Sequence, residues 1–515
     1  MNDRFWYKIW QAALLFAVIA MLAASLVVQA SNVSSADVRE ILADHGLSDQ
    51  GTSLEWPIDE SIRPELTPIA KLQSAPADEG HITYAPAVAD PIARSDQRIF
   101  DVSIESVEGM CPLDPASGTT TEQWGFRIAG DTEVTCGTPG PILRGRVGDV
   151  VNITFTNLAG NKKPHNIDFH AVTGQGGGAA DLTVVPGETG TIQVRLLYPG
   201  AFMYHCAYGD VPSHIAHGMY GMFIVDPEVP LPEVDEEWAI MQSEWYVGEP
   251  DANGVAQYDP AAVLDEDATF VTFNGRTDAL TGDNTLTMNV GERARIYFVN
   301  HGLALNSNFH PIGSQWDLVY PEAATHSANR VIRGSQTTLV SAGGGTVVEL
   351  DALVPSTILL VDHALGRTFY KGALGTIVVS GDEQPELFNV LQAATAATGG
   401  ETSTVTTTIV SEAAVGAEVS IPEGAFDPAN AANAFDPLDL SITVGTTVKW
   451  TNDDALAHTV TSGMSDGMVG TPDGFFDSGF LMPGDTYSHT FNDPGEFTYY
   501  CLPHPWMLGT VTVTS

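Results

Sequence analysis

The sequence predicts an all-β protein of three Greek-key β-sandwich domains. The chain has 515 residues, too many for one domain, and it is rich in turn formers, with 50 Gly and 31 Pro. Long helical patterns are rare, and short alternating strands recur at even spacing. Short strands separated by turn signals are typical of β-sandwiches.

Two sequence pieces recur along the chain and mark the three domains. The first is a Val-Gly turn followed by an alternating strand that ends in Asn, at 147–157, 290–300 and 444–452. The second occupies 198–206, 354–363 and 493–501, and a closing strand follows each copy at 221–225, 375–379 and 509–513. We therefore place the domains at 96–228, 236–381 and 408–515, with a linker over 382–407 that is rich in Ala, Thr and Gly.

The N-terminus has the pattern of an export signal. Arg4 and Lys8 flank the start of an apolar run over 9–28, and small residues follow it. We interpret 1–30 as a signal peptide or membrane anchor and 31–95 as an irregular, acidic and Pro-rich stalk. The rest of the chain is then exported to the periplasm or the extracellular face, secreted or held by this segment.

The charge balance excludes some function classes. The chain has 64 Asp and Glu against 21 Lys and Arg, a formal charge of −43. Such a surface does not bind nucleic acid non-specifically, and any membrane contact is expected through the N-terminus only. The excess of acid with scarce Lys suggests a protein adapted to high salt, as in a halophile, although ordinary exported proteins can also be acidic.

Two domains carry the residues of a blue-copper site. The third domain has Cys501, His504 and Met507 on one short loop, and His458 lies upstream. Two imidazoles, a thiolate and a weak thioether are the ligands of a type 1 copper electron-transfer centre. The first domain has the same set on a longer loop: His165, Cys206, His214 and Met219.

The first domain adds two histidines beside this set. His205 precedes Cys206, and His170 follows His165 by five residues. Because neighbouring side chains on a strand point to opposite faces, Cys206 can face one metal while His205 faces another.

The middle domain adds a third histidine and has no cysteine. We align Asp362-His363-Ala364 with Tyr204-His205-Cys206, which puts Ala364 at the thiolate position, and we align His310 with the upstream histidine of the other domains. Three imidazoles, His170, His205 and His363, leave an open coordination position and so predict a catalytic metal. Asp168 and His310 are the candidate proton donors.

These motifs resemble those of copper-containing nitrite reductases. The resemblance covers 96–381, and the spacing from Cys206 to His214 and the string over 214–221 are similar to the outer-membrane branch in Neisseria. The loop over 500–507 resembles that of amicyanin, a plastocyanin-like cupredoxin.

The resemblance carries expectations for the whole protein. It implies cupredoxin domains, a homotrimer, and nitrite reduction to nitric oxide, as in denitrification and nitrogen metabolism. It implies type 1 copper at His165, Cys206, His214 and Met219, and type 2 copper at His170 and His205 of one subunit and His363 of its neighbour. Asp168 and His310 match the proton-relay pair, and Ile312 the apolar residue of the nitrite pocket. The third domain is then expected to be a tethered electron donor, or a receiver for an external cupredoxin or cytochrome.

Two other functions stay open on the sequence. A laccase-like multicopper oxidase needs H-x-H pairs for its trinuclear cluster, and the chain has none. A non-catalytic electron carrier explains Cys206 and Cys501 but leaves the catalytic histidines without a role. Cys111 and Cys136 are either a disulfide or two free thiols, since export permits the bond. The remaining histidines are expected at the surface: His45, His81, His301, His326 and His489.

Overall fold

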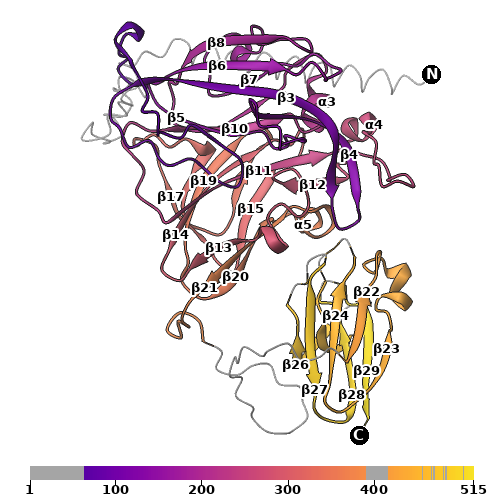
Figure 1. Ribbon diagram of the computed structural model, residues 1–515. Coiled ribbons are helices and arrows are strands. Elements are labelled where there is room, and N and C mark those ends of the chain that lie inside the picture. The colour runs from indigo at the N-terminus through magenta and orange to yellow at the C-terminus, as the bar shows by residue number, and fades with distance from the viewer. Residues whose placement is uncertain are drawn as a thin grey trace, which may run out of the picture. The chain divides into compact units, whose positions relative to one another are not determined.

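The computed structural model describes residues 63–389 and 416–514, apart from a few positions within 455–503. The predicted signal segment and most of the predicted linker lie outside the described residues. Among the residues described, no helix is long and apolar enough to cross a membrane. The predicted all-β class is confirmed, and Figure 1 shows the strands grouped in three β-sandwiches along the chain.

The first domain is formed by two sheets of five strands. One has the order β1-β3-β6-β8 with β4 paired to β3, and the other has the order β2-β5-β10-β9-β7. The strands are β1 (Gln73–Ser74), β2 (Ile82–Thr83), β3 (Arg98–Asp114), β4 (Thr119–Ile128), β5 (Ile142–Arg146), β6 (Val150–Asn157), β7 (Asp168–Phe169), β8 (Thr189–Arg195), β9 (Gly200–His205) and β10 (Tyr220–Asp226). Helix α3 (Val211–Ala216) lies between β9 and β10. Alternating burial along β6 directs Val151, Ile153 and Phe155 into the core.

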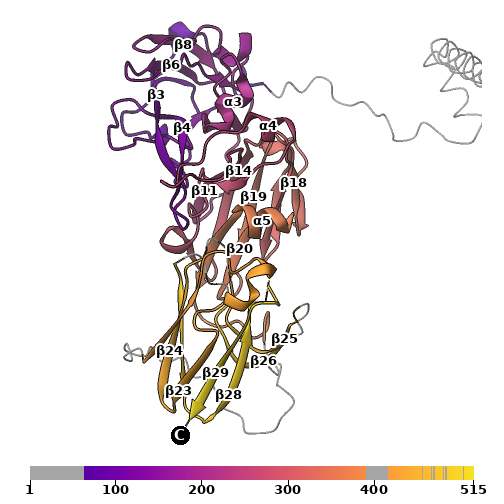
Figure 2. The same ribbon diagram turned by 90° about the vertical axis from the view of Figure 1, so that its right-hand side faces the viewer.

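The middle domain repeats this plan with sheets of six and five strands. Their orders are β12-β11-β14-β19-β16-β17 and β13-β21-β20-β15-β18. The strands are β11 (Glu236–Trp245), β12 (Phe270–Phe273), β13 (Leu286–Asn289), β14 (Arg293–Asn300), β15 (Ser307–Ile312), β16 (Trp316–Tyr320), β17 (Ile332–Ser335), β18 (Thr338–Val340), β19 (Gly345–Asp351), β20 (Ser356–Asp362) and β21 (Leu374–Ser380). Helix α4 (Pro260–Leu264) precedes β12, and α5 (Leu365–Lys371) packs beside β12 and β20. Figure 2 shows α5 next to β20.

The third domain has the simplest pair of sheets. They run β22-β24-β27 and β23-β29-β28-β25-β26. The strands are β22 (Ala417–Ile421), β23 (Asp439–Thr443), β24 (Thr446–Asn452), β25 (Thr461–Ser465), β26 (Gly470–Asp477), β27 (Thr486–Phe491), β28 (Gly495–Tyr500) and β29 (Leu508–Thr514). Short 3-10 turns complete the chain: η1 (Ile69–Lys71), η2 (Gln175–Gly178), η3 (Gly282–Asn284), η4 (Pro321–Ala323) and η5 (Pro428–Asn433).

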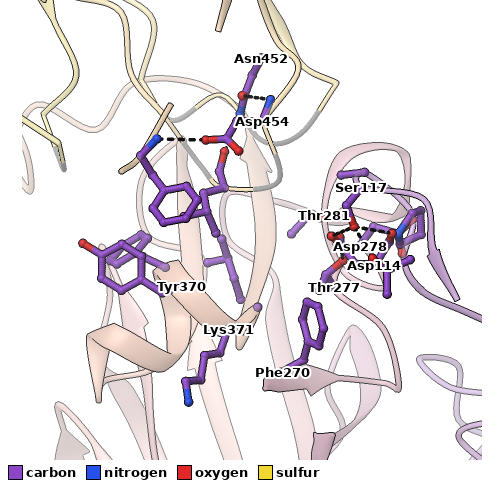
Figure 3. Close-up of a pocket in the computed structure, with 18 of the residues that line it drawn as sticks. Asp114, Ser117, Phe270, Thr277, Asp278, Thr281, Tyr370, Lys371, Asn452 and Asp454 are labelled. Atoms are coloured by element: carbon purple, nitrogen blue, oxygen red, sulfur yellow. Dashed lines mark hydrogen bonds between the residues drawn. The ribbon is translucent and has the colours of Figure 1, made fainter. Parts of the chain in front are cut away.

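The first two domains share an apolar interface. Met203 and Tyr220 of the first domain pack in one buried cluster with Met241 and Tyr297 of the middle domain. At the tip of the β3–β4 hairpin, the Thr277 hydroxyl donates to an Asp114 carboxylate oxygen at 2.7 Å, and Ser117 donates to the other oxygen (Figure 3). These contacts hold the two domains together as one unit.

Two features near the start of the first domain concern earlier expectations. Part of the segment predicted as an irregular stalk forms strands instead, because β1 pairs with β3 and β2 with β5. The Arg94 guanidinium also bridges Glu79 and Asp149, which ties this segment to the sandwich. The structure joins Cys111 and Cys136 in a disulfide across a sequence separation of 25 residues.

Candidate metal centres

The predicted type 1 ligands of the first domain converge in one buried pocket. The Cys206 thiol lies 3.2 Å from His214 Nδ1 and 4.0 Å from His165 Nδ1, and the two Nδ1 atoms are 3.3 Å apart. Cys206 follows the last residue of β9, His214 lies in α3, and the buried Met219 directly precedes β10. Three ligand atoms within 4.8 Å of one another fit a single copper ion bound by a thiolate and two imidazoles.

The ligand side chains of this pocket are uncharged when no metal is bound. Burial lowers the pKa of His214 to about 3 and raises the pKa of the Cys206 thiol to about 11. Both imidazoles are therefore neutral at pH 7, because burial also lowers the pKa of His165. The thiol must lose a proton when copper binds.

The third domain has the same pocket on a shorter loop. The Cys501 thiol lies 3.5 Å from His458 Nδ1 and 3.4 Å from His504 Nδ1, and Met507 is fully buried beside them. Burial raises the pKa of Cys501 to about 12 and lowers that of His504 to about 4. The close agreement with the first domain indicates a second type 1 site.

A carboxylate that the sequence did not reveal contacts the outer ring nitrogen, Nε2, of each upstream histidine. His165 Nε2 lies 2.9 Å from Glu108 Oε1, and Glu108 also accepts the backbone N–H groups of Lys162 and Lys163. His458 Nε2 lies 2.8 Å from Asp454 Oδ2. A carboxylate on the outer nitrogen fixes the ring orientation and directs Nδ1 toward the metal.

The carboxylate of Asp454 is itself anchored by the surrounding chain. It accepts the backbone N–H groups of Gly424 and Phe426, and its own N–H donates to the Asn452 side chain at 3.0 Å (Figure 3). Asp454 lies four residues before its histidine, whereas Glu108 lies 57 residues before His165. Only the nearer of the two could have been found from spacing.

Trp124 is a further residue that sequence reasoning missed. Its indole stacks on the buried His217 ring at 3.8 Å between centroids and lies edge-on to the copper-ligand candidate His214 at 4.9 Å. No sequence motif marks it. His217 itself lies outside the group of ligand atoms formed by His165, Cys206 and His214.

A second group of ligands lies on the opposite face of β9. His205 Nε2 and His170 Nε2 are 3.2 Å apart, and a carboxylate oxygen of Asp168 joins them. His205 Nδ1 lies 3.0 Å from the carbonyl oxygen of Cys206, which fixes Nε2 as the ligand atom. Burial and the neighbouring His205 lower the pKa of His170, so this imidazole is neutral and able to bind metal.

The structure does not bring all predicted type 2 residues together within one chain. Three groups of His, Cys and acidic residues converge in the parts of the chain that the structure describes, and none of them contains His363. His363 instead lies beside His310, with ring centroids 5.0 Å apart, and His363 is exposed whereas His310 is half-buried. One chain thus presents a two-histidine half on the first domain and a one-histidine half on the middle domain.

The strand register corrects the alignment of the middle domain. In each domain the side chain of one Asn donates hydrogen bonds to two carbonyl oxygens, and these residues are Asn157, Asn300 and Asn452. One carbonyl belongs to a loop residue, and the other belongs to the residue that forms a β-bridge with the upstream ligand position. The bridged pairs are His165–Val184, Ser307–Val340 and His458–Leu481. Ser307, and not His310, therefore occupies the position of the upstream histidine.

The thiolate position also differs from the predicted one. Tyr204 pairs with Gly221 and Leu360 pairs with Gly375, so β20 aligns with β9 at these residues. Asp362 then occupies the position of Cys206, and the alignment that placed Ala364 there is wrong. On the same register His310 corresponds to Asp168 and Ile312 to His170, so the two proton-donor candidates hold equivalent positions in the two domains.

The histidines expected at the surface are less exposed than predicted. His301 is 1% exposed and stacks on Tyr220 at 4.6 Å. His81, His326 and His489 are half-buried, and His45 lies outside the described residues. The expectation is wrong for His301 because the turn after β14 folds back onto the domain interface.

Comparisons with known proteins agree with this geometry. The profile described as "Copper binding proteins, plastocyanin/azurin family" matches residues 423–514, and the profile described as "Multicopper oxidase" matches residues 110–229. A copper-containing nitrite reductase of Neisseria meningitidis is 40% identical over 313 residues, which cover 61% of this chain and 78% of that protein. This chain belongs to the copper-containing nitrite reductase family.

More distant relatives also match part of this chain. The copper-containing nitrite reductase of Pseudomonas chlororaphis is 33% identical, over 50% of this chain and 74% of its own length. The solved copper nitrite reductase of Nitrosomonas europaea is 32% identical, over 56% of this chain and 96% of its own, with a TM-score of 0.48. Family membership and the two kinds of pocket support type 1 and type 2 copper as the cofactors, with an additional cupredoxin domain at the C-terminus.

Proposed function

We propose that this protein reduces nitrite to nitric oxide. The observation that carries the proposal is the adjacency of His205 and Cys206, which places one residue in each of two separate metal pockets joined by a single peptide bond. When copper is bound, the type 1 pocket supplies one-electron transfer and the type 2 pocket supplies a Lewis acid with an open position. In the reaction, nitrite takes one electron and two protons and yields nitric oxide and water.

The type 2 site is proposed to form between subunits of a homotrimer. His170 and His205 make one half, and the partner subunit's His363 completes it. The supporting observation is that His170 and His363, one from each half, are exposed in one chain, and that each half is incomplete alone. The same docking brings His310 and Ile312 toward the site together with His363, since both lie on β15, which pairs with β20, the strand that His363 directly follows.

Asp168 and His310 are proposed to handle the two protons. Asp168 lies within the same ligand group as His170 and His205, so its carboxyl group can donate to a nitrite oxygen. His310 Nδ1 is held by the carbonyl oxygen of Gln336, which leaves Nε2 free to relay the second proton. Ile312 supplies an apolar wall that restricts the substrate to a small anion.

The third domain is proposed to be a tethered electron donor. Its pocket matches that of the first domain in ligand type and distance, and a tether raises the local donor concentration to roughly the millimolar range. The net charge of −43 also suits an attached donor, because acidic surfaces repel most acidic partners. The alternatives are a receiver for an external cupredoxin or cytochrome, or a spacer.

The site of action is proposed to be outside the cytoplasm, either as a secreted protein or as one anchored by residues 1–30. The disulfide between Cys111 and Cys136 supports an oxidising compartment. The acidic surface supports a saline habitat.

One experiment tests the activity and a second tests the donor role. Purified, copper-loaded protein should convert nitrite to nitric oxide with an artificial donor, and His363→Ala should abolish turnover while leaving the blue colour. Removal of 382–515 should leave the rate with an artificial donor and lower the rate with the physiological donor. If the truncated protein had the same rate as the full-length protein with every donor, the donor role would be contradicted.

A multicopper oxidase is the second candidate, favoured by the profile match over 110–229. A trinuclear cluster needs many converging histidines, and in the described residues the only group outside the type 1 pockets contains two, His170 and His205. Oxygen consumption with a phenolic substrate, and no nitric oxide from nitrite, would support the oxidase instead.

A further inference from the structure

We propose that the ion pair between Asp362 and Arg367 fills the vacated type 1 pocket of the middle domain and positions His363 for the type 2 copper. The proposal rests on the proposed function, because it takes His363 as a ligand of that copper. It concerns residues that carry none of the predicted ligand roles.

The first argument is that Asp362 occupies the thiolate position by its hydrogen bonds. The backbone N–H of Asn308 donates to Asp362 Oδ1 at 3.0 Å. The corresponding N–H groups of Asn166 and Thr459 donate to the sulfur atoms of Cys206 and Cys501 at 3.5 and 3.3 Å. The acceptor atom in each domain is therefore the group that faces the pocket.

The loop that closes the pocket gives the other two positions. The residue at the thiolate position donates its N–H to the carbonyl of the residue just before the closing strand. These pairs are Cys206–Met219, Cys501–Met507 and Asp362–Ala373. The residue before the closing strand, Met219, Met507 or Ala373, in turn donates its own N–H to the carbonyl of a loop residue, which is His214, His504 or Arg367 respectively. Ala373 thus replaces the methionine, and Arg367 replaces the second histidine.

The four exchanges convert a metal site into an ion pair. Histidine, cysteine, histidine and methionine become Ser307, Asp362, Arg367 and Ala373. Asp362 is fully buried, and Arg367 Nη1 lies 2.7 Å from its Oδ2. The guanidinium supplies a fixed positive charge where the other two pockets hold copper, so the buried carboxylate is neutralised without metal.

The same pair controls the backbone around His363. Asp362 Oδ1 accepts the N–H of Ala364 at 3.1 Å. The side chain of the residue before His363 therefore bonds to the backbone of the residue after His363. The N–H of Arg367 donates to the carbonyl of Ala364 at 2.7 Å, and its Nη1 donates to the carbonyl of Asn306. The N–H of His363 itself donates to the carbonyl of Asn308 at 2.8 Å. Asp362 and Arg367 are positioning residues, since they act through the backbone that carries the imidazole.

The test measures type 2 copper affinity in the full-length trimer. Arg367→Gln leaves an unpaired carboxylate and should weaken type 2 copper binding about ten- to a hundredfold, in the range found when outer-shell partners of metal ligands are removed. The type 1 EPR signal and the blue absorbance should not change, because those pockets lie in the other domains. Arg367→Lys keeps the positive charge and should restore most of the affinity.

A matched control separates positioning from a general loss of stability. Arg293 makes an ion pair with Asp351 in the middle domain, on the other sheet, with side chains that are 35% and 31% exposed. Arg293→Gln should lower the melting temperature and leave type 2 affinity unchanged. If Arg367→Gln bound type 2 copper as tightly as the wild type, the positioning role would be wrong. If the wild-type protein showed type 1 signals and no type 2 signal, the proposed function would fail, and the inference with it.

Discussion

The first and middle domains share one fold and differ in what fills the same pocket. In the first domain His165, Cys206 and His214 converge there with neutral imidazoles and a protonated thiol. In the middle domain Asp362 and Arg367 meet in that place. The difference shows that the fold supplies a rigid frame of backbone hydrogen bonds, and four side chains decide whether the frame holds a metal or a fixed ion pair.

The middle domain keeps the backbone hydrogen bonds of this pocket, although it lacks the metal ligands. Glu244 aligns with Glu108, because Gln242 pairs with Asn300 as Ser106 pairs with Asn157. Glu244 still accepts backbone N–H groups from the loop at Ala304 and Leu305, as Glu108 does at Lys162 and Lys163. The histidine that Glu108 holds is gone, and the Tyr246 hydroxyl donates to Glu244 instead.

The largest expected effect comes from removing one thiolate at a time. Cys206→Ser should remove about half of the blue absorbance and reduce nitrite turnover to the level of the copper-free protein, because His205 loses its covalent link to a redox centre. Cys501→Ser should remove the other half and leave turnover with an artificial donor intact. Absorbance spectra and nitric oxide electrode traces of both variants check this, and equal activity losses would break the proposed difference between the domains.

Asp168→Asn should lower turnover by about 10²–10⁴-fold, the usual contribution of a positioned proton donor. The amide keeps the shape and cannot give a proton at neutral pH. Copper content and both EPR signals should match the wild type. Wild-type turnover in this variant would exclude Asp168 as the donor.

Part of this account could be predicted from sequence, and the reason is locality. Cys501, His504 and Met507 lie on one short loop, so their spacing alone indicates a metal pocket. Glu108 could not be found in this way, because it reaches His165 from a strand 57 residues away. The shared histidine suggests that His363 aligns with His205, whereas the pairing of Leu360 with Gly375 aligns Asp362 with Cys206. The pairing of β1 and β2 with the sandwich was also invisible in a stretch without steady periodicity.

A smaller effect is expected at the carboxylates behind the upstream histidines. Glu108→Gln and Asp454→Asn should each weaken copper binding in their own domain by about ten- to a hundredfold, because the outer nitrogen loses its charged acceptor. Glu244→Gln, at the equivalent position of the middle domain, should leave the copper content per chain unchanged. Copper titrations followed by absorbance measure all three variants. Loss of copper in Glu244→Gln would contradict the proposed difference between the middle pocket and the two type 1 pockets.

The smallest effect concerns acid stability of the copper-free protein. In the folded state the pKa of His214 is lowered to about 3 and that of His504 to about 4, below the ordinary value of 6.5. The unfolded chain therefore binds protons first as the pH falls from 6.5, and folding stability is lost over that interval down to the folded pKa. The middle pocket has no such histidine.

Hydrogen exchange at pH 7 and pH 4.5 checks this difference. Protection factors, which correct for the slower intrinsic exchange at lower pH, should fall in the loops 206–219 and 501–507 and change little over 362–373. A uniform fall in protection across the three loops would show that the acid effect does not come from the copper-pocket histidines.

The central claim is that two of the three domains hold type 1 copper, and that the third site holds a type 2 copper and is completed by the middle domain. Copper analysis with quantitative EPR on the full-length, copper-loaded protein tests it most directly. The account predicts three coppers per chain, with type 1 and type 2 signals in a ratio of two to one. Two coppers per chain with type 1 signals alone would contradict it.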